Sequence, residues 1–361
     1  MKRLARQPGE WIDRSHPVRF VFEGEAYRGF RGDTLTSALM ANGRRTLGRS
    51  FKYHRRRGAL SVANHDVNAV VQVRRAHGIV PNERADGLAI EEGLESYAVN
   101  TQGGLEHDRR AWLDRFSSFL PVGFYYKAFH GKRLFPYWER RIREVAGLGE
   151  VDLSAPRRPT PKRYEFADVA VIGAGPAGLA AAAAAADAGA EVALIDENPR
   201  HGGSGSYALG SDGAASERMH DLLQSVSSNN RIRALLSTTA VGYYADHWLA
   251  LDTADRLLKL RARAVIIAQG AYEQPAVFRN NDLPGVMLAS GAQRLLRRYA
   301  VAPASRIVIV AANVHAYRAA LDARAAGIDV VAILDLRERA GSQSLLLAEM
   351  LRVQGVQIMQ N

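Results

Sequence analysis

The 361-residue chain contains no cysteine. A disulfide, a redox dithiol, a thiolate metal site and a cysteine-ligated iron–sulfur cluster all need a thiol, so the sequence excludes them. Long apolar runs are missing too, because the most apolar stretch, Ala180–Ala186, ends at Asp187. A membrane-spanning helix needs about 20 apolar residues, so none is expected. Met1–Arg6 has no apolar run behind it, so we expect no secretory signal and a cytoplasmic location.

The net charge of +11 is concentrated in the first part of the chain. Residues 1–163 contain 30 Lys and Arg against 18 Asp and Glu, whereas residues 164–361 contain 18 against 19. A basic half attracts something acidic, either nucleic acid, a phosphate-bearing cofactor or an acidic partner protein. No DNA- or RNA-binding module accompanies the charge, so nucleic acid is not an expected partner.

Residues 1–104 predict a small α+β domain. Two alternating segments, Val18–Phe22 and Ala26–Phe30, flank a Glu-Gly-Glu turn and predict a hairpin. Asp33 is then expected to cap a short helix at Thr34–Asn42. Asn68–Val73 predicts a further strand. A hairpin, a helix and a strand in this order indicate a β-grasp domain of the ferredoxin-like kind, here without cysteines.

Residues 105–163 are predicted to connect this domain to the rest. The segment is aromatic and basic, and it ends in a Pro-rich linker, Ala155–Pro161, which suits neither a helix nor an inner strand. Aromatic residues together with Arg favour a subunit interface over stacking on nucleic-acid bases. The aromatic residues are Phe116, Phe119, Phe124, Tyr125, Tyr126, Phe129, Phe135, Tyr137 and Trp138.

Residues 164–361 alternate predicted strands with helices. This order is typical of a doubly wound α/β domain, the FAD/NAD(P)-binding Rossmann fold, with a small antiparallel insert. Arg256–Leu260 and Ala264–Ala268 predict two separate strands near the end of that insert. A partial second Rossmann unit follows them.

The sharpest motif is a Gly-x-Gly-x-x-Gly turn between a predicted strand and an Ala-rich helix. The first glycine allows a tight turn, the second lets the backbone approach a pyrophosphate, and the third lets the helix pack against the sheet. The helix N-terminus then presents free N–H groups to the phosphates. A dinucleotide site is therefore predicted, and its turn residues are Gly173, Ala174, Gly175, Pro176, Ala177 and Gly178.

The acidic pair Asp196–Glu197 indicates which dinucleotide binds. Asp196 lies 18 residues after Gly178, where a carboxylate reaches a ribose hydroxyl. A carboxylate repels a 2′-phosphate, which disfavours NADP and leaves NAD and FAD open. The next loop contains Gly203 and either closes over the cofactor or is a flexible surface loop. Ala264–Gly270 resembles the returning strand of two-dinucleotide-domain flavoproteins, whose glycine turn passes near the first cofactor.

The second strand–helix unit, Arg306–Tyr317, lacks these glycines. Side chains at their positions block the approach of a pyrophosphate, so this unit is predicted to be structural and without a nucleotide. His315 is a catalytic residue or, more in keeping with a helix start, a cap or a surface residue. No nucleophile triad, acid/base pair or metal-ligand cluster is evident, so the catalytic residues are unknown and no metal ligand is predicted.

Two further strings, Gly48–Gly58 and Asn281–Ser290, together with the glycine turn make the chain similar to the alpha subunits of heterotetrameric sarcosine oxidases. This resemblance implies an N-terminal domain like two-iron ferredoxins and a dinucleotide domain that holds NAD. It also implies FMN between the alpha and beta subunits, FAD in the beta subunit, and small gamma and delta subunits. In such a complex sarcosine is oxidised, oxygen accepts the electrons and tetrahydrofolate accepts the one-carbon unit.

The chain departs from its relatives in two ways. Cluster-bearing relatives, such as opine oxidase and cyanide synthase subunits, have cysteines where this chain has Ala59–Ala63, so no iron–sulfur cluster is expected. The folate-binding domain is missing, so the chain is expected to be inactive alone and to be part of a longer subunit. Two alternatives stay open, a subunit of a related opine, proline or amine dehydrogenase and a nucleotide-stabilised scaffold. The basic stretch Lys52–Arg57 is open between FMN phosphate, an acidic partner and solvent.

Overall fold

The computed structural model describes residues 2–75, 78–119, 123, 131–156, 159–208 and 213–360. The chain forms two compact units, one of Met1–Pro156 with Pro275–Asn361 and one of Arg157–Gln274. This grouping differs from the predicted division at residues 104 and 163, which stays a prediction. Of the predicted connecting segment and linker, Phe124, Tyr125, Tyr126, Phe129, Arg157 and Arg158 lie outside the described residues.

The first unit begins with a five-stranded sheet of order β3-β2-β8-β6-β7. The β2–β3 hairpin turns between Phe22 and Glu25, as predicted, while β2 and β8 run parallel. One helix, α1, buries Leu35 and Leu39 against Phe20 and Phe22 of the sheet. This is the predicted β-grasp domain. Its elements are β1 Lys2–Arg3, β2 Asp13–Phe22, β3 Glu25–Arg31, α1 Leu35–Ala41, β4 Gly48–Arg49, β5 Arg56–Arg57, β6 Val70–Arg75, β7 Gly78–Arg84, β8 Leu94–Ala98, η1 Ala111–Phe119 and α3 Phe135–Ala146.

Helix α1 lies where the sequence predicts it, but the prediction that Asp33 caps it is wrong. Thr34 is the N-cap, and its hydroxyl accepts from the backbone N of Ser37 while Ser37 Oγ accepts from the backbone N of Thr34. Asp33 is buried, and it accepts from Arg3 at 2.7 Å and from Ser37 Oγ at 2.6 Å. The ion pair with a distant arginine, which the local sequence does not reveal, takes Asp33 away from the cap position.

Residues 275–361 of the same unit pack against this domain through α6. Tyr299 meets Trp11 edge to face at 6.2 Å between ring centroids, and the guanidinium of Arg298 lies 3.9 Å from the Trp11 ring. β15 pairs antiparallel with β1. A three-stranded parallel sheet, β16-β17-β18, follows with helices α7 and α8. The elements are α6 Ala289–Tyr299, β15 Val301–Ala302, β16 Arg306–Ala311, α7 Val314–Ala325, β17 Asp329–Asp335, α8 Ser342–Val353 and β18 Gln357–Gln360.

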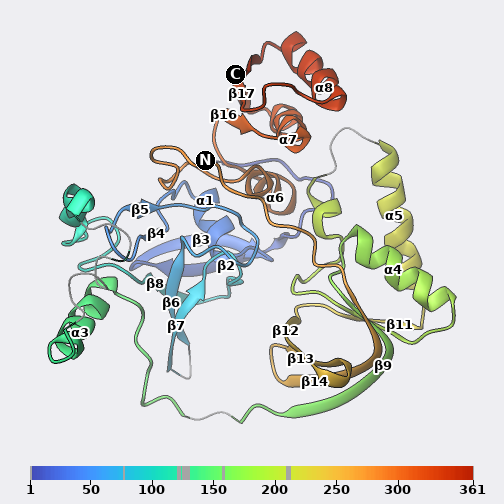
Figure 1. Ribbon diagram of the computed structural model, residues 1–361, viewed down its shortest axis with the longest axis horizontal. Helices are drawn as coiled ribbons and strands as arrows, with labels where there is room; N and C mark the ends of the chain where they lie inside the picture. The colour runs from blue at the N-terminus through green and yellow to red at the C-terminus, as the bar shows by residue number, and fades with distance from the viewer. Residues whose placement is uncertain are drawn as a thin grey trace. The chain divides into compact units, whose positions relative to one another are not determined.

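The second unit is a six-stranded sheet of order β11-β10-β9-β14-β13-β12. Strands β11, β10, β9 and β14 are parallel, and β13 and β12 form the predicted antiparallel insert. Helices α4 and α5 share one apolar core on the same face of the sheet, and they lie next to each other in Figure 1. The elements are β9 Lys162–Ile172, α4 Pro176–Asp187, β10 Val192–Ile195, η2 Gly203–Ser206, α5 Gly213–Ser228, β11 Ile232–Leu235, β12 Thr239–Tyr244, η3 Ala245–His247, β13 Trp248–Asp252 and β14 Leu257–Ile267.

One strand prediction in this unit is wrong. The sequence predicts separate strands at Arg256–Leu260 and Ala264–Ala268, but the structure has a single strand, β14. Its register with β9 runs from Leu257 opposite Lys162 to Ile267 opposite Ile172, and the two long strands lie side by side in Figure 1. The residue pattern changes midway because β14 pairs with β13 over its first part only, from Leu257 to Arg261.

Candidate dinucleotide site

The glycine turn joins β9 to α4 at the carboxyl edge of the parallel strands. Gly173 has a φ of +105°, and a Cβ on it would lie 2.4 Å from the Ala268 carbonyl oxygen. A Cβ on Gly178 would lie 1.8 Å from the Gly173 carbonyl oxygen. Real side chains do not fit at these distances, so the fold itself requires both glycines whether or not a ligand binds.

Gly175 differs, because the fold does not require it. Its φ is −78°, and a Cβ there would meet only the Gly203 Cα, at 3.7 Å. Gly175 is the N-cap of α4, no side chain caps the helix, and Pro176 follows at the first turn. The helix therefore starts with open space beside backbone N–H groups that no side chain satisfies, which is what an anionic pyrophosphate needs.

Asp196 lies at this turn, as its spacing predicts. It is buried, and its carboxylate accepts from the backbone N of Ala174 at 2.6 Å and from the backbone N and Nδ2 of Asn198 at 2.8 and 2.9 Å. The Ala174 carbonyl accepts from Gly202 N at 2.8 Å. Both backbone groups of Ala174 are thus used within the fold, so it shapes the turn and offers no free donor. Glu197 is exposed.

The two other predicted glycines come from segments that approach the same turn. Gly203 starts η2 with a φ of +49°, and a Cβ on it would lie 2.6 Å from the Gly175 Cα. The glycine-rich loop therefore packs directly on the turn. Ala268 donates from its backbone N to Ile172 O at 2.8 Å, and Gly270 follows with a φ of +77° and nothing within 4 Å of a Cβ position. The structure thus brings together the segments 173–178, 196–203 and 268–270.

His201 is a residue that the sequence reasoning missed. It lies in the glycine-rich loop, half-buried, and its Nε2 is a buried atom without a hydrogen-bond partner among the described residues. Burial lowers the pKa of His201, while the nearby Asp196 acts in the opposite direction. A neutral imidazole with an unused ring nitrogen is a candidate contact for a bound nucleotide. Only its place between Asp196 and Gly203 in the sequence signals this.

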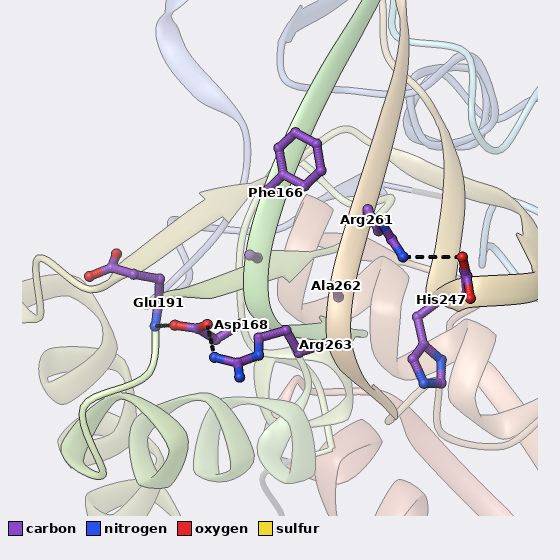
Figure 2. Close-up of a pocket in the computed structure, with 9 residues that line it drawn as sticks. Phe166, Asp168, Glu191, His247, Arg261, Ala262 and Arg263 are labelled. Atoms are coloured by element: carbon purple, nitrogen blue, oxygen red, sulfur yellow. Dashed lines mark hydrogen bonds and ion pairs between the residues drawn. The ribbon is translucent and has the colours of Figure 1, made fainter.

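A surface depression of the second unit, about 740 Å³, is not this site. Figure 2 shows it beside the middle of β9, at Phe166 and Asp168, with Asp168 between the backbone N of Glu191 and the guanidinium of Arg263. Arg261 pairs with Asp246 at 3.1 Å. The backbone bond from Glu191 holds the pKa of Asp168 below its usual value. The charged residues that line the depression thus pair with one another. Asp168 also lies five residues before Gly173, about 17 Å along an extended strand, so the depression is separate from the glycine turn.

The basic stretch of the first unit is neutralised largely within the chain. Arg55 donates to Asp282 Oδ1 at 3.1 Å, and Arg57 also pairs with the Asp282 carboxylate. Arg56 pairs with Glu106 at 3.1 Å. The structure therefore contains a contact between distant parts of the chain, which is none of the interpretations that the sequence left open for this stretch.

The described part of the chain has no metal-binding group of three or more His, Cys, Asp or Glu side chains. Within the same described ranges, no helix has the length and apolar character needed to cross a membrane.

Two families match the sequence. Residues 167–361 match the family described as pyridine nucleotide-disulphide oxidoreductase, and residues 15–102 match a 2Fe-2S iron–sulfur cluster binding domain. The second match concerns the fold of the domain, because a chain without cysteine has no thiolate for such a cluster.

Curated relatives match along most of the chain. The alpha subunit of sarcosine oxidase from Rhizobium meliloti (strain 1021) is 40% identical over 350 residues, which are 91% of this chain and 35% of the relative. That of Corynebacterium sp. (strain U-96) is 31% identical over 352 residues, 92% of this chain and 32% of the relative. An opine oxidase subunit from Agrobacterium tumefaciens (strain Ach5) is 32% identical over 187 residues, 47% of this chain and 37% of the relative. The chain spans about one third of the length of these proteins.

Among solved structures, the L-proline dehydrogenase from P. horikoshii superposes with a TM-score of 0.62 at 21% identity. The match covers 92% of this chain and 56% of that one, which shows a shared fold. The resemblance predicted from the sequence is confirmed. The chain belongs to the pyridine nucleotide-disulphide oxidoreductase family and is a homologue of the sarcosine oxidase alpha subunits.

Proposed function

We propose that this chain binds one NAD and is the nucleotide-binding part of a sarcosine oxidase alpha subunit. The observation that carries the proposal is the uncapped N-terminus of α4, with open space at Gly175 and the carboxylate of Asp196 at the same turn. Helix starts of this kind bind phosphates, and an acid in this place binds an adenosine ribose.

Most of the predicted residues have a role in this proposal. The backbone of Gly175, Ala177 and Gly178 faces the pyrophosphate, with Pro176 shaping the first turn, and Asp196 accepts from a ribose hydroxyl in exchange for a bond from Asn198. Gly203 and Gly270 border the cofactor, and Glu197 lies outside its immediate contacts. A bound nicotinamide dinucleotide or flavin supplies hydride-transfer chemistry. FAD is the alternative ligand because it presents the same ribose.

The activity of the whole complex is part of the proposal. Identity of 40% along 91% of the chain supports a sarcosine oxidase, in which sarcosine becomes glycine, electrons pass to oxygen and the one-carbon unit passes to tetrahydrofolate. The partners are then beta, gamma and delta subunits, with FMN at the interface and FAD in the beta subunit. We also propose a cytoplasmic location and no iron–sulfur cluster, since the chain has no thiolate to hold one.

The cofactor proposal is tested by releasing bound nucleotide from the purified chain with denaturant and identifying it by mass spectrometry. NAD is expected, and FAD would support the alternative. Calorimetric titration then compares NAD with NADP. Equal affinity for the two would contradict the role of Asp196. Iron and acid-labile sulfide in stoichiometric amounts would contradict the proposed lack of a cluster.

A second candidate is a related amine dehydrogenase subunit, which the fold shared with L-proline dehydrogenase favours. The opine oxidase similarity covers 47% of the chain, about half of what the sarcosine oxidase similarity covers, so we place it second. The complex assembled with its partner subunits should turn over sarcosine faster than proline or an opine. The lone chain should release no peroxide with sarcosine. Turnover by the lone chain would overturn the subunit proposal, and a complex active without nucleotide in this chain would favour a scaffold.

A further inference from the structure

The loop after Gly58 lies within residues 15–102, which match a 2Fe-2S iron–sulfur cluster binding domain, yet the chain has no cysteine. Residues 58–66, here called the anchor loop, are nevertheless well packed, and Ala59, Ser61 and Val62 are buried. Val62 has a φ of +51°, a left-handed conformation that is unfavourable for a β-branched residue. Such a loop needs strong contacts to hold it in place.

Two buried carboxylates supply those contacts. Asp66 Oδ2 accepts from the backbone N of Leu60 at 2.6 Å and of Ser61 at 3.2 Å, and its Oδ1 accepts from Asn68 N at 2.9 Å. Asp86 Oδ2 accepts from the backbone N of Ala63 at 3.0 Å and of Asp66 at 3.1 Å. The two side chains are 2% and 1% exposed, so these are hydrogen bonds to carboxylates away from solvent.

The two carboxylates differ in one respect. Both oxygens of Asp66 accept hydrogen bonds, whereas Asp86 Oδ1 is buried and has no partner among the described residues. Burial, with the neighbouring Asp66 charge, raises the pKa of Asp86 to about 6. His65 acts in the opposite direction. From α6, Tyr299 also interacts with Asp86, and burial raises the pKa of Tyr299 to about 12.

The anchor loop also contacts the start of α6. The backbone N of Leu288 donates to Leu60 O at 2.9 Å, and Arg294 Nη1 donates to Ser61 O at 2.9 Å. A Cβ on Gly291 would lie 2.7 Å from Leu60 O, so the helix rests directly on the loop. Whatever orders the loop therefore also positions α6.

We propose that Asp66 and Asp86 anchor this loop in a chain that has no thiolate for a cluster, with Asp66 as the permanent acceptor and Asp86 as the part that responds to protons. Protonation of Asp86 at its unpartnered oxygen removes a buried charge and leaves the other oxygen free to accept. The loop, and the α6 contacts on it, are then held more firmly in mildly acidic solution.

The direction of the pH effect follows from the two states of the chain. An unfolded chain releases the Asp86 proton near the ordinary pKa of 3.8, whereas the folded chain keeps it to about pH 6. Between these values the folded state binds a proton that the unfolded state does not. The contribution of Asp86 to stability therefore rises as the pH falls from about 6 to about 4.

Isosteric variants of the full chain separate the two roles. Asp66→Asn places an NH2 group against a backbone N–H, so amide exchange at Leu60 and Ser61 should speed up by about tenfold or more. Asp86→Asn keeps one acceptor and removes the charge, so at about pH 7.5 its urea midpoint should equal or exceed that of the parent. Near pH 4.5, where Asp86 holds its proton, that difference should vanish. Asp187→Asn, at an exposed position, is the control.

Two outcomes would overturn the proposal. One is an Asp86→Asn variant that is destabilised relative to the parent at both pH values. The other is slower exchange at the anchor loop after iron and sulfide are added under reducing conditions, since that would mean a cluster held by other ligands. If Asp66→Asn does not fold, the pH series of Asp86→Asn still decides.

Discussion

The two strand–helix–strand units of this chain follow one plan and differ at the positions where a ligand would sit. In the first, Ile195 of β10 pairs with Ile172 of β9, so Asp196 lies beside Gly173. In the second, Asp335 of β17 pairs with Ala311 at the end of β16. A constant offset of 138 residues gives the corresponding pairs Gly173 and Ala311, Gly175 and Asn313, Gly178 and Ala316, and Leu179 and Tyr317. The strand pairing makes Asp335 the counterpart of Asp196.

The strand–helix–strand unit β16–α7–β17 satisfies its own polar groups. The Asn313 side chain accepts from the backbone N of His315 at 3.0 Å and so caps α7, where α4 has no cap. His315 is an exposed residue in the first turn of the helix and is not its cap. Asp335 accepts from Tyr317 OH at 2.7 Å and from Arg337 Nη2 at 2.7 Å. The same fold thus leaves the helix start without a side-chain cap at α4 and closes it with its own side chain at α7.

The largest effect is expected at Gly175. Gly175→Val should lower the melting temperature only modestly, because the φ is ordinary and a Cβ would make an ordinary contact with the Gly203 Cα, while valine is a poorer N-cap than glycine. The valine side chain would occupy the space of the pyrophosphate, so NAD affinity should fall by more than about 100-fold. Calorimetric titration measures the affinity. Asn313→Val is the matched control in the unit β16–α7–β17, and it should leave NAD affinity unchanged.

The next largest effects are expected at the two buried acids, Asp335 and Asp196, and they should differ in kind. The Arg337 hydrogen bonds lower the pKa of Asp335 to about 2. This contribution is present above the unfolded pKa of 3.8 and is lost as the pH falls towards 2. Asp335→Asn should therefore cost about 2 kcal/mol at neutral pH and remove that acid-sensitive component. Urea unfolding at neutral and acidic pH measures both effects.

Asp196→Asn should lower both the stability of the chain and its NAD affinity, whereas Asp335→Asn should lower the stability alone. Both oxygens of Asp196 accept hydrogen bonds, so the amide would face a donor and lower the urea midpoint. The lost carboxylate should also weaken NAD binding by about tenfold or more. Unchanged NAD affinity in Asp196→Asn would mean that the acid only anchors the loop at Asn198.

The sequence was sufficient to predict the glycine turn, because its glycines are set by contacts within the strand–turn–helix itself. Gly173 and Gly178 are excluded from carrying side chains by neighbouring backbone, and the helix begins at the predicted Pro176. The β-grasp hairpin was equally local. β14 was misread as two strands because its pattern is alternating up to Arg261, where it pairs with both β13 and β9, and becomes a continuous apolar run at its end, where it pairs with β9.

Contacts between distant segments could not be predicted. Arg57 and Asp282 form a pair that joins positions far apart in the sequence, so the basic stretch looked free. Asp196 was placed correctly, but its bonds to Ala174 N and Asn198 depend on the loop conformation. The carboxylates of Asp66 and Asp86 likewise meet only in the folded β-grasp domain.

The smallest expected effect belongs to the cap of α7. Asn313→Ala should destabilise the chain by about 1 kcal/mol, because the backbone N of His315 loses its acceptor. Asn313→Gly should cost only a few tenths of a kcal/mol. Neither variant should gain NAD binding, since Asp335 stays paired with Arg337 and Tyr317, and a Cβ remains at Ala311 and Ala316. Each Asn313 variant is also combined with Gly175→Val, so that any NAD bound in the titration must bind to the unit β16–α7–β17. A nucleotide bound there would mean that the cap alone had kept that position closed.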